Sequence, residues 1–188
     1  MFESMMENWP YWVVTVFVIV AAYIDGKLLK VPNKITYPMI IAGWVYSIIT
    51  YQLAGEGWYM GLLWSLAGTV VGLLTLLPAY AIGGMGAGDV KMMAAVGAWV
   101  HVVTTFYAFC VSAIVGAVIA IIMIVVSGDT KKHWAQAQFI LNEIMTVKDP
   151  EKLAALAAKR KPKMRLLPYG IPLAIGTVMY FAWMGMLV

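Results

Sequence analysis

Long apolar runs alternate with short polar stretches along the chain. The first three runs cover residues 9–25, 35–53 and 58–82, lengths suited to helices that cross the ~30 Å hydrocarbon core of a bilayer at about 1.5 Å per residue. The 35 residues 92–126 contain no Lys, Arg, Asp or Glu and are too long for one crossing. We therefore expect two helices, at 89–101 and 103–126, with a tight turn between them. A sixth run covers residues 166–188.

The segment 128–165 has a different pattern. Apolar residues such as Trp134, Leu141 and Met145 recur at helical spacing among polar ones. Residues 149–151 read Asp-Pro-Glu, which is typical of a helix start with an N-cap, a first-turn proline and an acidic residue. We expect interfacial amphipathic helices here, and the basic run 159–165 suits an anionic lipid surface. A solvated cytoplasmic loop explains the charge pattern equally well.

The composition supports a membrane protein. Of the 188 residues, 63% are hydrophobic and 12% are charged, whereas a soluble domain carries about 25% charged residues. This excludes a soluble enzyme, a coiled coil and a disordered tail. The predicted fold is a single all-α integral membrane domain, with a bundle of about six transmembrane helices and the amphipathic segment between the fifth and sixth. A single cysteine and two histidines far apart in sequence match no disulfide framework or metal motif, so we expect no metal and no cofactor.

The charges are sorted between the two sides of the predicted bundle. With six spans, all 13 Lys and Arg residues share one side, namely Lys27, Lys30, Lys34, Lys91 and the nine basic residues of 131–165. The other side holds Glu3, Glu7, Glu56 and His101. The positive-inside rule then places both termini outside and the basic loops in the cytoplasm, whereas five spans would split the basic loops. The net charge of +4 is therefore a topology signal, and no nucleic-acid partner is expected. The residues before the first helix lack the basic stretch of a secretory signal, so this helix is expected to be retained.

Two carboxylates stand at helix ends on the predicted cytoplasmic side, with Asp25 closing the first helix and Asp89 opening the fourth. An ionisable residue at membrane depth costs on the order of 2.5–3.5 kcal/mol on insertion, which makes each a functional candidate. Two carboxyl groups at one depth can hydrolyse a peptide bond when one is ionised and activates water while the other, protonated, polarises the carbonyl. Each aspartate alone is also explained as a helix-end charge, Asp25 paired with Lys27 or Lys30 and Asp89 as a solvated cap.

The glycines before Asp89 favour close backbone approach. Gly86 and Gly88 allow the chain to turn freely and allow a substrate strand to lie against the loop, although a flexible loop is the simpler interpretation. The residues leave two functions open, a membrane aspartic peptidase and a small transporter in which the aspartates bind protons or cations. No H-E-x-x-H or G-x-S-G motif is present, and no serine–histidine pair is expected at one depth, which argues against metalloprotease and serine-protease chemistry.

Three blocks carry a resemblance to a known family. Residues 83–91 read GGMGAGDVK and resemble the signature of the prepilin peptidases, which are GxGD-type aspartic proteases of the membrane. Residues 25–33, DGKLLKVPN, are similar to the family's other block, an aspartate followed by a hydrophobic residue, proline and asparagine. Residues 167–172, LPYGIP, resemble the entry to the family's last helix. The short length and single large loop are most similar to the peptidases of tight-adherence (Flp) pili, with archaeal preflagellin peptidases as a second possibility.

The resemblance implies an enzyme that removes a short basic leader from type IV pilin-like precursors at the cytoplasmic face of the bacterial inner membrane. Asp25 and Asp89 match the family's catalytic aspartates. Gly86, Gly88 and Lys91 are expected in the substrate-binding loop. Structural support is expected from Pro32, Asn33, Gly83, Gly84, Pro168, Tyr169 and Gly170. Longer members carry an N-terminal domain with paired cysteines that N-methylates the product. This chain starts almost directly in its first helix and has only Cys110, so we expect no methyltransferase activity and no zinc.

Three further side chains have simple interpretations. Lys91 could act on the carboxyl of Asp89 or extend to lipid head groups, and the second is favoured. Asn33 follows Pro32 and is interpreted as a cap of the second helix. His101 is expected to be a turn residue far from the aspartates.

Overall fold

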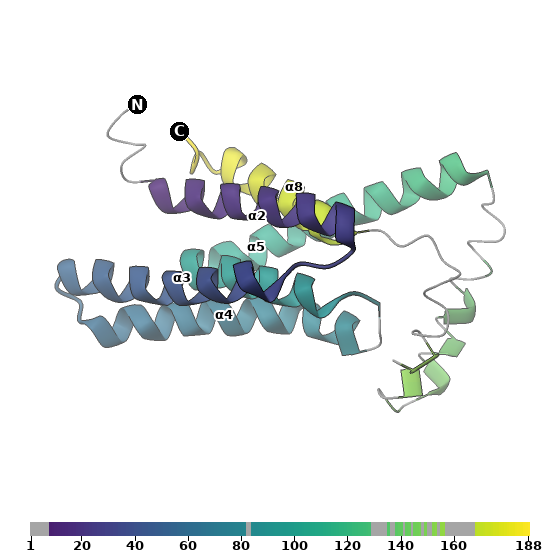
Figure 1. Cartoon of the computed structure of the whole chain (residues 1–188), viewed down its shortest axis with the longest axis horizontal. Coiled ribbons are helices and arrows are strands. Elements are labelled where there is room, and N and C mark those ends of the chain that lie inside the picture. The colour runs from purple at the N-terminus through teal and green to yellow at the C-terminus, as the bar shows by residue number, and fades with distance from the viewer. Residues whose placement is uncertain are drawn as a thin grey trace.

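The computed structural model describes residues 8–81, 84–128 and 168–188, together with scattered residues between 135 and 156. The regular elements in these residues are helices. They are α2 (Trp9–Leu28), α3 (Asn33–Leu53), α4 (Trp58–Ala81), α5 (Ala87–Ser127) and α8 (Gly170–Trp183). Figure 1 shows them side by side in an elongated bundle. The predicted all-α fold class is confirmed.

Helix α5 is two helices joined at a sharp turn. His101 has φ 60° and ψ −169°, which is not helical backbone. Before this turn α5 lies along α4, where Gly97 meets Gly68, and after it α5 lies along α8, where Gly116 meets Pro172. These contacts and the path of the ribbon in Figure 1 show that the two halves of α5 run antiparallel to each other. The sequence places a turn in this region, and the structure has it at His101. We call the end of the bundle at Asp25 and Asp89 the aspartate end, and the opposite end at His101 the histidine end.

The first half of α5 is the centre of the bundle. All nine residues 92–100 are buried, and most of them are small or apolar. Glycines let neighbouring helices approach closely, since a Cβ on Gly68 would lie 2.1 Å from the carbonyl oxygen of Gly97. Ser65 Oγ donates a hydrogen bond to the Ala98 carbonyl oxygen at the same contact. This close packing fixes the position of α5, and hence of Asp89 at its start.

The outer surface of the bundle is apolar. Among the described residues, three helices are long and apolar enough to cross a membrane, namely α2, α4 and α5. Helix α3 has 21 residues but a less apolar sequence, and α8 is a shorter apolar helix of 14 residues. Many large apolar side chains on these helices are exposed, as expected for contact with lipid. The chain is therefore an integral membrane protein.

Helix ends differ from the predicted runs by a few residues. Helix α2 continues to Leu28, beyond the predicted end at residue 25, and α3 starts two residues early. Helix α8 is shorter than the run 166–188, because the chain turns after Trp183 and Gly185 adopts a φ of 68°. The start of that run lies outside the described residues. So do most of the segment 128–165 and the basic run 159–165, for which the expected lipid contact stays a prediction.

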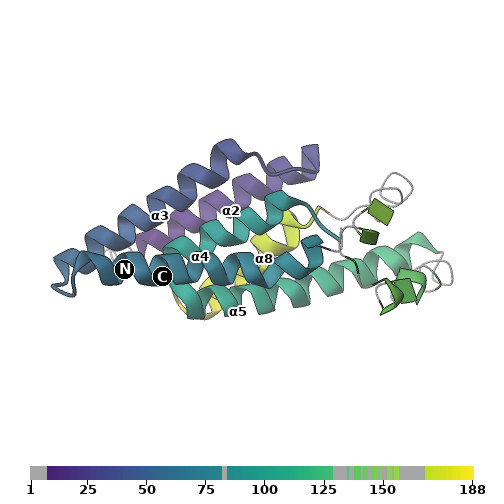
Figure 2. The ribbon, with the colours of Figure 1, turned by 90° about the horizontal axis from the view of Figure 1, so that it is seen from below.

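The two termini of the described chain meet at the histidine end. Asn8 Nδ2 donates a hydrogen bond to the carbonyl oxygen of Val188 over 3.0 Å. Figures 1 and 2 both show α2 and α8 ending near one another at this end. The opposite ends of these two helices, at Asp25 in α2 and Gly170 in α8, therefore lie together at the aspartate end. There the Gly170 backbone N–H donates a hydrogen bond to the Asp25 carboxyl group.

Candidate active site

Asp25 and Asp89 line the same cavity, although they come from different helices. Asp25 lies in the last turns of α2, and Asp89 is the third residue of α5. Their side chains are largely buried, with exposures of 4% and 5%. The cavity has a volume of about 440 Å³ and opens at the aspartate end. The predicted site residues that line it are Asp25, Asn33, Gly84, Gly86, Gly88, Asp89, Lys91, Pro168 and Tyr169.

The start of α8 anchors the side chain of Asp25. The Gly170 backbone N–H donates to Asp25 Oδ2 over 2.9 Å, a contact between residues 145 positions apart in the sequence. A Cβ on Gly170 would lie 2.9 Å from that oxygen and 3.0 Å from Asp25 Cβ, so a side chain there would displace the aspartate. Lys27, offered by the sequence as a partner for Asp25, instead donates to the Tyr23 hydroxyl and lies over the Tyr23 ring.

Asp89 both caps the start of its own helix and forms part of the cavity wall. The Gly86 N–H at the N-cap position donates to Asp89 Oδ2 over 3.3 Å. The expected capping role is therefore present, but the expected solvation is not, because the side chain is 5% exposed. A carboxylate at this position also faces the positive end of the helix dipole. The cap fixes Asp89 at the cavity wall.

We call residues 84–88, between α4 and Asp89, the glycine loop. It lies directly against the connection between α2 and α3. A Cβ on Gly88 would come within 2.9 Å of the Val31 nitrogen and 3.1 Å of its oxygen, so the two backbones meet here without room for a side chain. Gly84 N–H donates to the Ala79 carbonyl oxygen over 2.8 Å, which turns the chain at the end of α4. Gly83 lies outside the described residues.

Lys91 is held by α3 rather than extending freely to head groups. Its Nζ donates to Asn33 Oδ1 over 2.9 Å and lies 4.8 Å from the centre of the Tyr37 ring. The prediction that Asn33 caps α3 is wrong. Pro32 occupies the N-cap position with no side-chain cap bond, and the Asn33 side chain faces Lys91 instead. The contact ties the start of α5 to the start of α3.

Sequence reasoning missed five residues that line the cavity. Two of them lie within the glycine block and three between Asp25 and Pro32, and they are Leu29, Lys30, Val31, Met85 and Ala87. The signal for them was their position inside the two motif blocks, from which most of the cavity lining comes. Among the described residues, no cluster of three His, Cys, Asp or Glu side chains could hold a metal ion.

A serine–histidine pair does exist, contrary to the sequence expectation. Ser47 Oγ and His101 Nε2 are 2.9 Å apart at the histidine end. The Ser47 hydroxyl also donates to the Gly61 carbonyl oxygen over 2.8 Å, and the residue is fully buried. Because a hydroxyl has a single proton and here directs it at a carbonyl, the imidazole is not placed to activate Ser47 as a nucleophile. The pair joins α3, α4 and α5 structurally.

Comparison with known proteins decides the family. Residues 12–121 match the type IV leader peptidase family, a stretch that covers more than half of the chain and contains both aspartates and the glycine loop. The chain belongs to this family. The predicted prepilin peptidase resemblance is thereby confirmed.

Two relatives share the name prepilin leader peptidase/N-methyltransferase. The protein from Neisseria gonorrhoeae is 30% identical over 130 residues, which are 65% of this chain and 42% of the relative. The protein from Bacillus subtilis (strain 168) is 30% identical over 119 residues, 62% of this chain and 45% of the relative. The chain thus matches less than half the length of these relatives. No solved structure matches the chain with significance. The apolar helices and these relatives identify a bacterial membrane protein.

Proposed function

We propose that the chain is an aspartic endopeptidase that removes the leader peptide from type IV pilin-like precursors. The observation that carries the proposal is the meeting of Asp25 and Asp89, from two different helices, in the wall of one cavity bordered by a glycine loop. The family match and the names of the two relatives support the choice of substrate. A pair of carboxyl groups in a partly water-accessible cavity is the arrangement that acid–base hydrolysis of an amide requires.

In the proposed mechanism the two aspartates share one proton. The ionised carboxylate takes a proton from a water molecule, whose oxygen attacks the scissile carbonyl carbon, while the other carboxyl group gives its proton to the carbonyl oxygen. The tetrahedral intermediate then loses its C–N bond, and the amine nitrogen leaves with the proton that the first aspartate received. One hydroxyl of the intermediate returns its proton to the other aspartate, which gives the carboxylic acid product and restores the singly protonated pair. The mechanism requires the two carboxyl groups to come to close range, where the repulsion between two charges favours the singly protonated state.

The substrate is proposed to bind as an extended strand against the glycine loop. A helical peptide hides its carbonyl groups in intrahelical hydrogen bonds, so the leader junction must unwind before water can attack. Gly86 and Gly88 line the cavity without side chains that would keep a strand away. Lys91 lies at the same wall, where its ammonium group is available to orient a carbonyl or carboxylate of the substrate.

We further propose that the aspartate end faces the cytoplasm, in the bacterial inner membrane. Lys30 and Lys91 line the cavity, and the other Lys and Arg residues are assigned to the same side by the sequence. Both termini then lie outside, and the basic run 159–165 contacts anionic lipids. Neutralising that run is expected to lower the stability of the protein in the membrane without loss of cleavage.

Cleavage is proposed to occur without N-methylation of the product. The support is the single cysteine of this chain, which cannot form the cysteine pairs expected of the methyltransferase domain in longer family members. Mass spectrometry of the processed pilin decides this point, because methylation adds a fixed mass to the new N-terminus. A methylated product formed by the purified chain would contradict the proposal.

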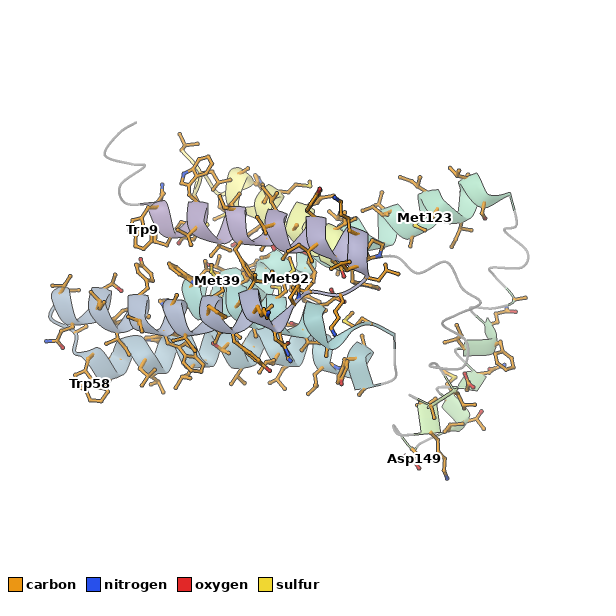
Figure 3. All side chains as sticks on the ribbon, in the orientation of Figure 1. Trp9, Met39, Trp58, Met92, Met123 and Asp149 are labelled. Carbon is orange, nitrogen blue, oxygen red and sulfur yellow. The ribbon has the colours of Figure 1, made fainter. Side chains whose placement is uncertain are left out.

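The aspartate pair is tested with Asp25→Asn and Asp89→Asn. Each is expected to lower the cleavage rate of a co-expressed precursor by about 10²–10⁴-fold, the scale for loss of a general acid or base. Asp149→Asn is the matched control, because Asp149 lies far from the cavity (Figure 3) and its side chain is about half exposed. Normal processing by either active-site variant would exclude the dyad. Ion flux in proteoliposomes that disappears in the same variants would instead support the transporter.

A further inference from the structure

Helices α2 and α3 are consecutive in the chain but diverge from each other. Helix α2 packs mainly on α8 and α5, whereas α3 packs on α4 and α5. Figure 1 shows the two ribbons separated over most of their length. An apolar groove with a volume of about 820 Å³ lies along α3 on this side, and Trp9 at the start of α2 borders it. We call it the α2–α3 groove.

One face of α3 forms the long wall of the α2–α3 groove. Its side chains Ile41, Val45, Ile49 and Leu53 recur every four residues and are between 48% and 82% exposed. Ala42 lies beside them and provides a small side chain at which another backbone can approach closely. The lining residues of α3 run from 38 to 53, about 24 Å at 1.5 Å per residue, which is most of the ~30 Å hydrocarbon core.

Aromatic side chains make the groove a preformed surface at the histidine end. Trp9 projects from the start of α2 towards α3, as Figure 3 shows, and its ring meets Tyr46 and Trp99 at centroid distances of 5.1 and 5.8 Å. Tyr46 stacks on Trp99 at 5.1 Å. Trp99 Nε1 donates to the Met39 carbonyl oxygen over 2.9 Å, which fixes α5 against α3 beneath the groove.

The same three helices border the groove and the aspartate cavity. Helix α2 contributes Trp9 to the groove and Asp25 to the cavity, and α5 contributes Trp99 and Asp89 in the same way. Helix α3 continues from the groove to Asn33 in the cavity wall. A helix that lies along α3 in the groove and continues past Pro38 would therefore run towards the cavity that holds the two carboxyl groups.

We propose that the α2–α3 groove seats the apolar transmembrane helix of the precursor and so delivers the leader junction to Asp25 and Asp89. This inference rests on the proposed peptidase function. In lipid there is no hydrophobic force to join two helices, so the groove must select the precursor helix over acyl chains by close packing on its fixed shape. The length of the groove along α3, and the course of α3 from the groove to Asn33 in the cavity wall, match a membrane helix that enters from the bilayer with its leader at the aspartate end.

The test compares Val45→Trp, which fills the groove, with Val70→Trp on α4 outside it. The two valines are 48% and 49% exposed, so the substitutions are matched in accessibility. For a full-length precursor, Val45→Trp is expected to raise KM about tenfold, the scale of one overpacked side chain, while Val70→Trp leaves it unchanged. A short peptide that contains the junction but no apolar helix is expected to be cleaved equally by both variants and by the unmodified protein.

Other outcomes overturn the inference. If both variants process the precursor normally while Asp25→Asn and Asp89→Asn remain inactive, the groove is not the docking site but the peptidase function stands. If Val45→Trp loses activity equally on precursor and peptide, the substitution acts through the fold and the inference fails.

A binding measurement decides the matter even if Val45→Trp does not accumulate. A photoreactive residue at Ile41 in the Asp89→Asn protein is expected to crosslink to the precursor. The same residue at Ile122, also 55% exposed but on α5 outside the groove, is expected to crosslink to lipid alone. Crosslinking to lipid alone from both positions would refute the assignment.

Discussion

The two ends of the bundle each hold a polar cavity, and they use their polar groups differently. The aspartate cavity has about 440 Å³ and a second cavity at the histidine end has about 470 Å³. Each is bordered by ionisable side chains, Asp25 and Asp89 at one end and His101 and Glu56 at the other. By size and the presence of ionisable groups alone, the two cavities are equal candidates for an active site.

The hydrogen bonds made by their polar side chains distinguish the two cavities. At the histidine end Ser47 bonds both the Gly61 carbonyl and the His101 ring, and Thr105 donates to the His101 carbonyl, so these groups hold three helices together. At the aspartate end backbone N–H groups of Gly86 and Gly170 orient the carboxyl groups in the wall of the cavity. Polar groups that satisfy one another build structure, whereas polar groups held by the backbone beside a cavity are placed for chemistry.

Among the substitutions that compare the two ends, the largest effect is expected where the backbone orients Asp25. Gly170→Ala would place a Cβ 2.9 Å from Asp25 Oδ2, and displacement of that carboxyl group is expected to lower kcat about a hundredfold. Gly26→Ala is the matched control, because a Cβ on this neighbour of Asp25 would meet only the Ile171 side chain, at an ordinary contact distance of 3.5 Å. Equal activity of the two variants in a precursor cleavage assay would contradict the positioning role of Gly170.

A second effect, on stability, tests the histidine end. Ser47→Ala leaves the Gly61 carbonyl and the His101 ring without this buried partner, and we expect a loss of about 1–3 kcal/mol in unfolding free energy. The cleavage rate of the remaining folded protein is expected to be unchanged. Thermal unfolding in detergent measures the first quantity, and Ser127→Ala, at the end of α5, serves as control. A loss of activity without a loss of stability would give the histidine end a catalytic role.

The smallest effect concerns the contact of Lys91 with Asn33. Removing it by Lys91→Met or Asn33→Ala is expected to cost about 1 kcal/mol, or a fivefold decrease in kcat/KM, because the start of α5 is less firmly held. The double variant is expected to be no worse than Lys91→Met alone, because the effects of residues in direct contact are not additive. Lys27→Met is the control, since Lys27 contacts Tyr23. Fully additive effects would show that the contact has no functional role.

Sequence patterns located the helices and the two aspartates because both signals are local. Apolar run length predicts a spanning helix, and a glycine block before Asp89 predicts a tight loop. The Ser47–His101 and Lys91–Asn33 contacts were missed because each joins residues more than 50 positions apart. Such contacts depend on the register in which helices pack, and a single sequence does not contain that register. The capping role assigned to Asn33 failed for the same reason, since a partner on another helix competed with the local one.

The shortness of α8 has a consequence for the supply of water. Fourteen residues span about 21 Å, well below the ~30 Å thickness of the hydrocarbon core. At the histidine end the chain continues with Met186 and Leu187, which pack against the bundle, so the shortfall lies at Gly170. A bilayer meets such hydrophobic mismatch by thinning locally. We expect such thinning to draw the membrane surface inward beside Asp25, and so to bring water molecules to the depth at which a peptide bond must be hydrolysed.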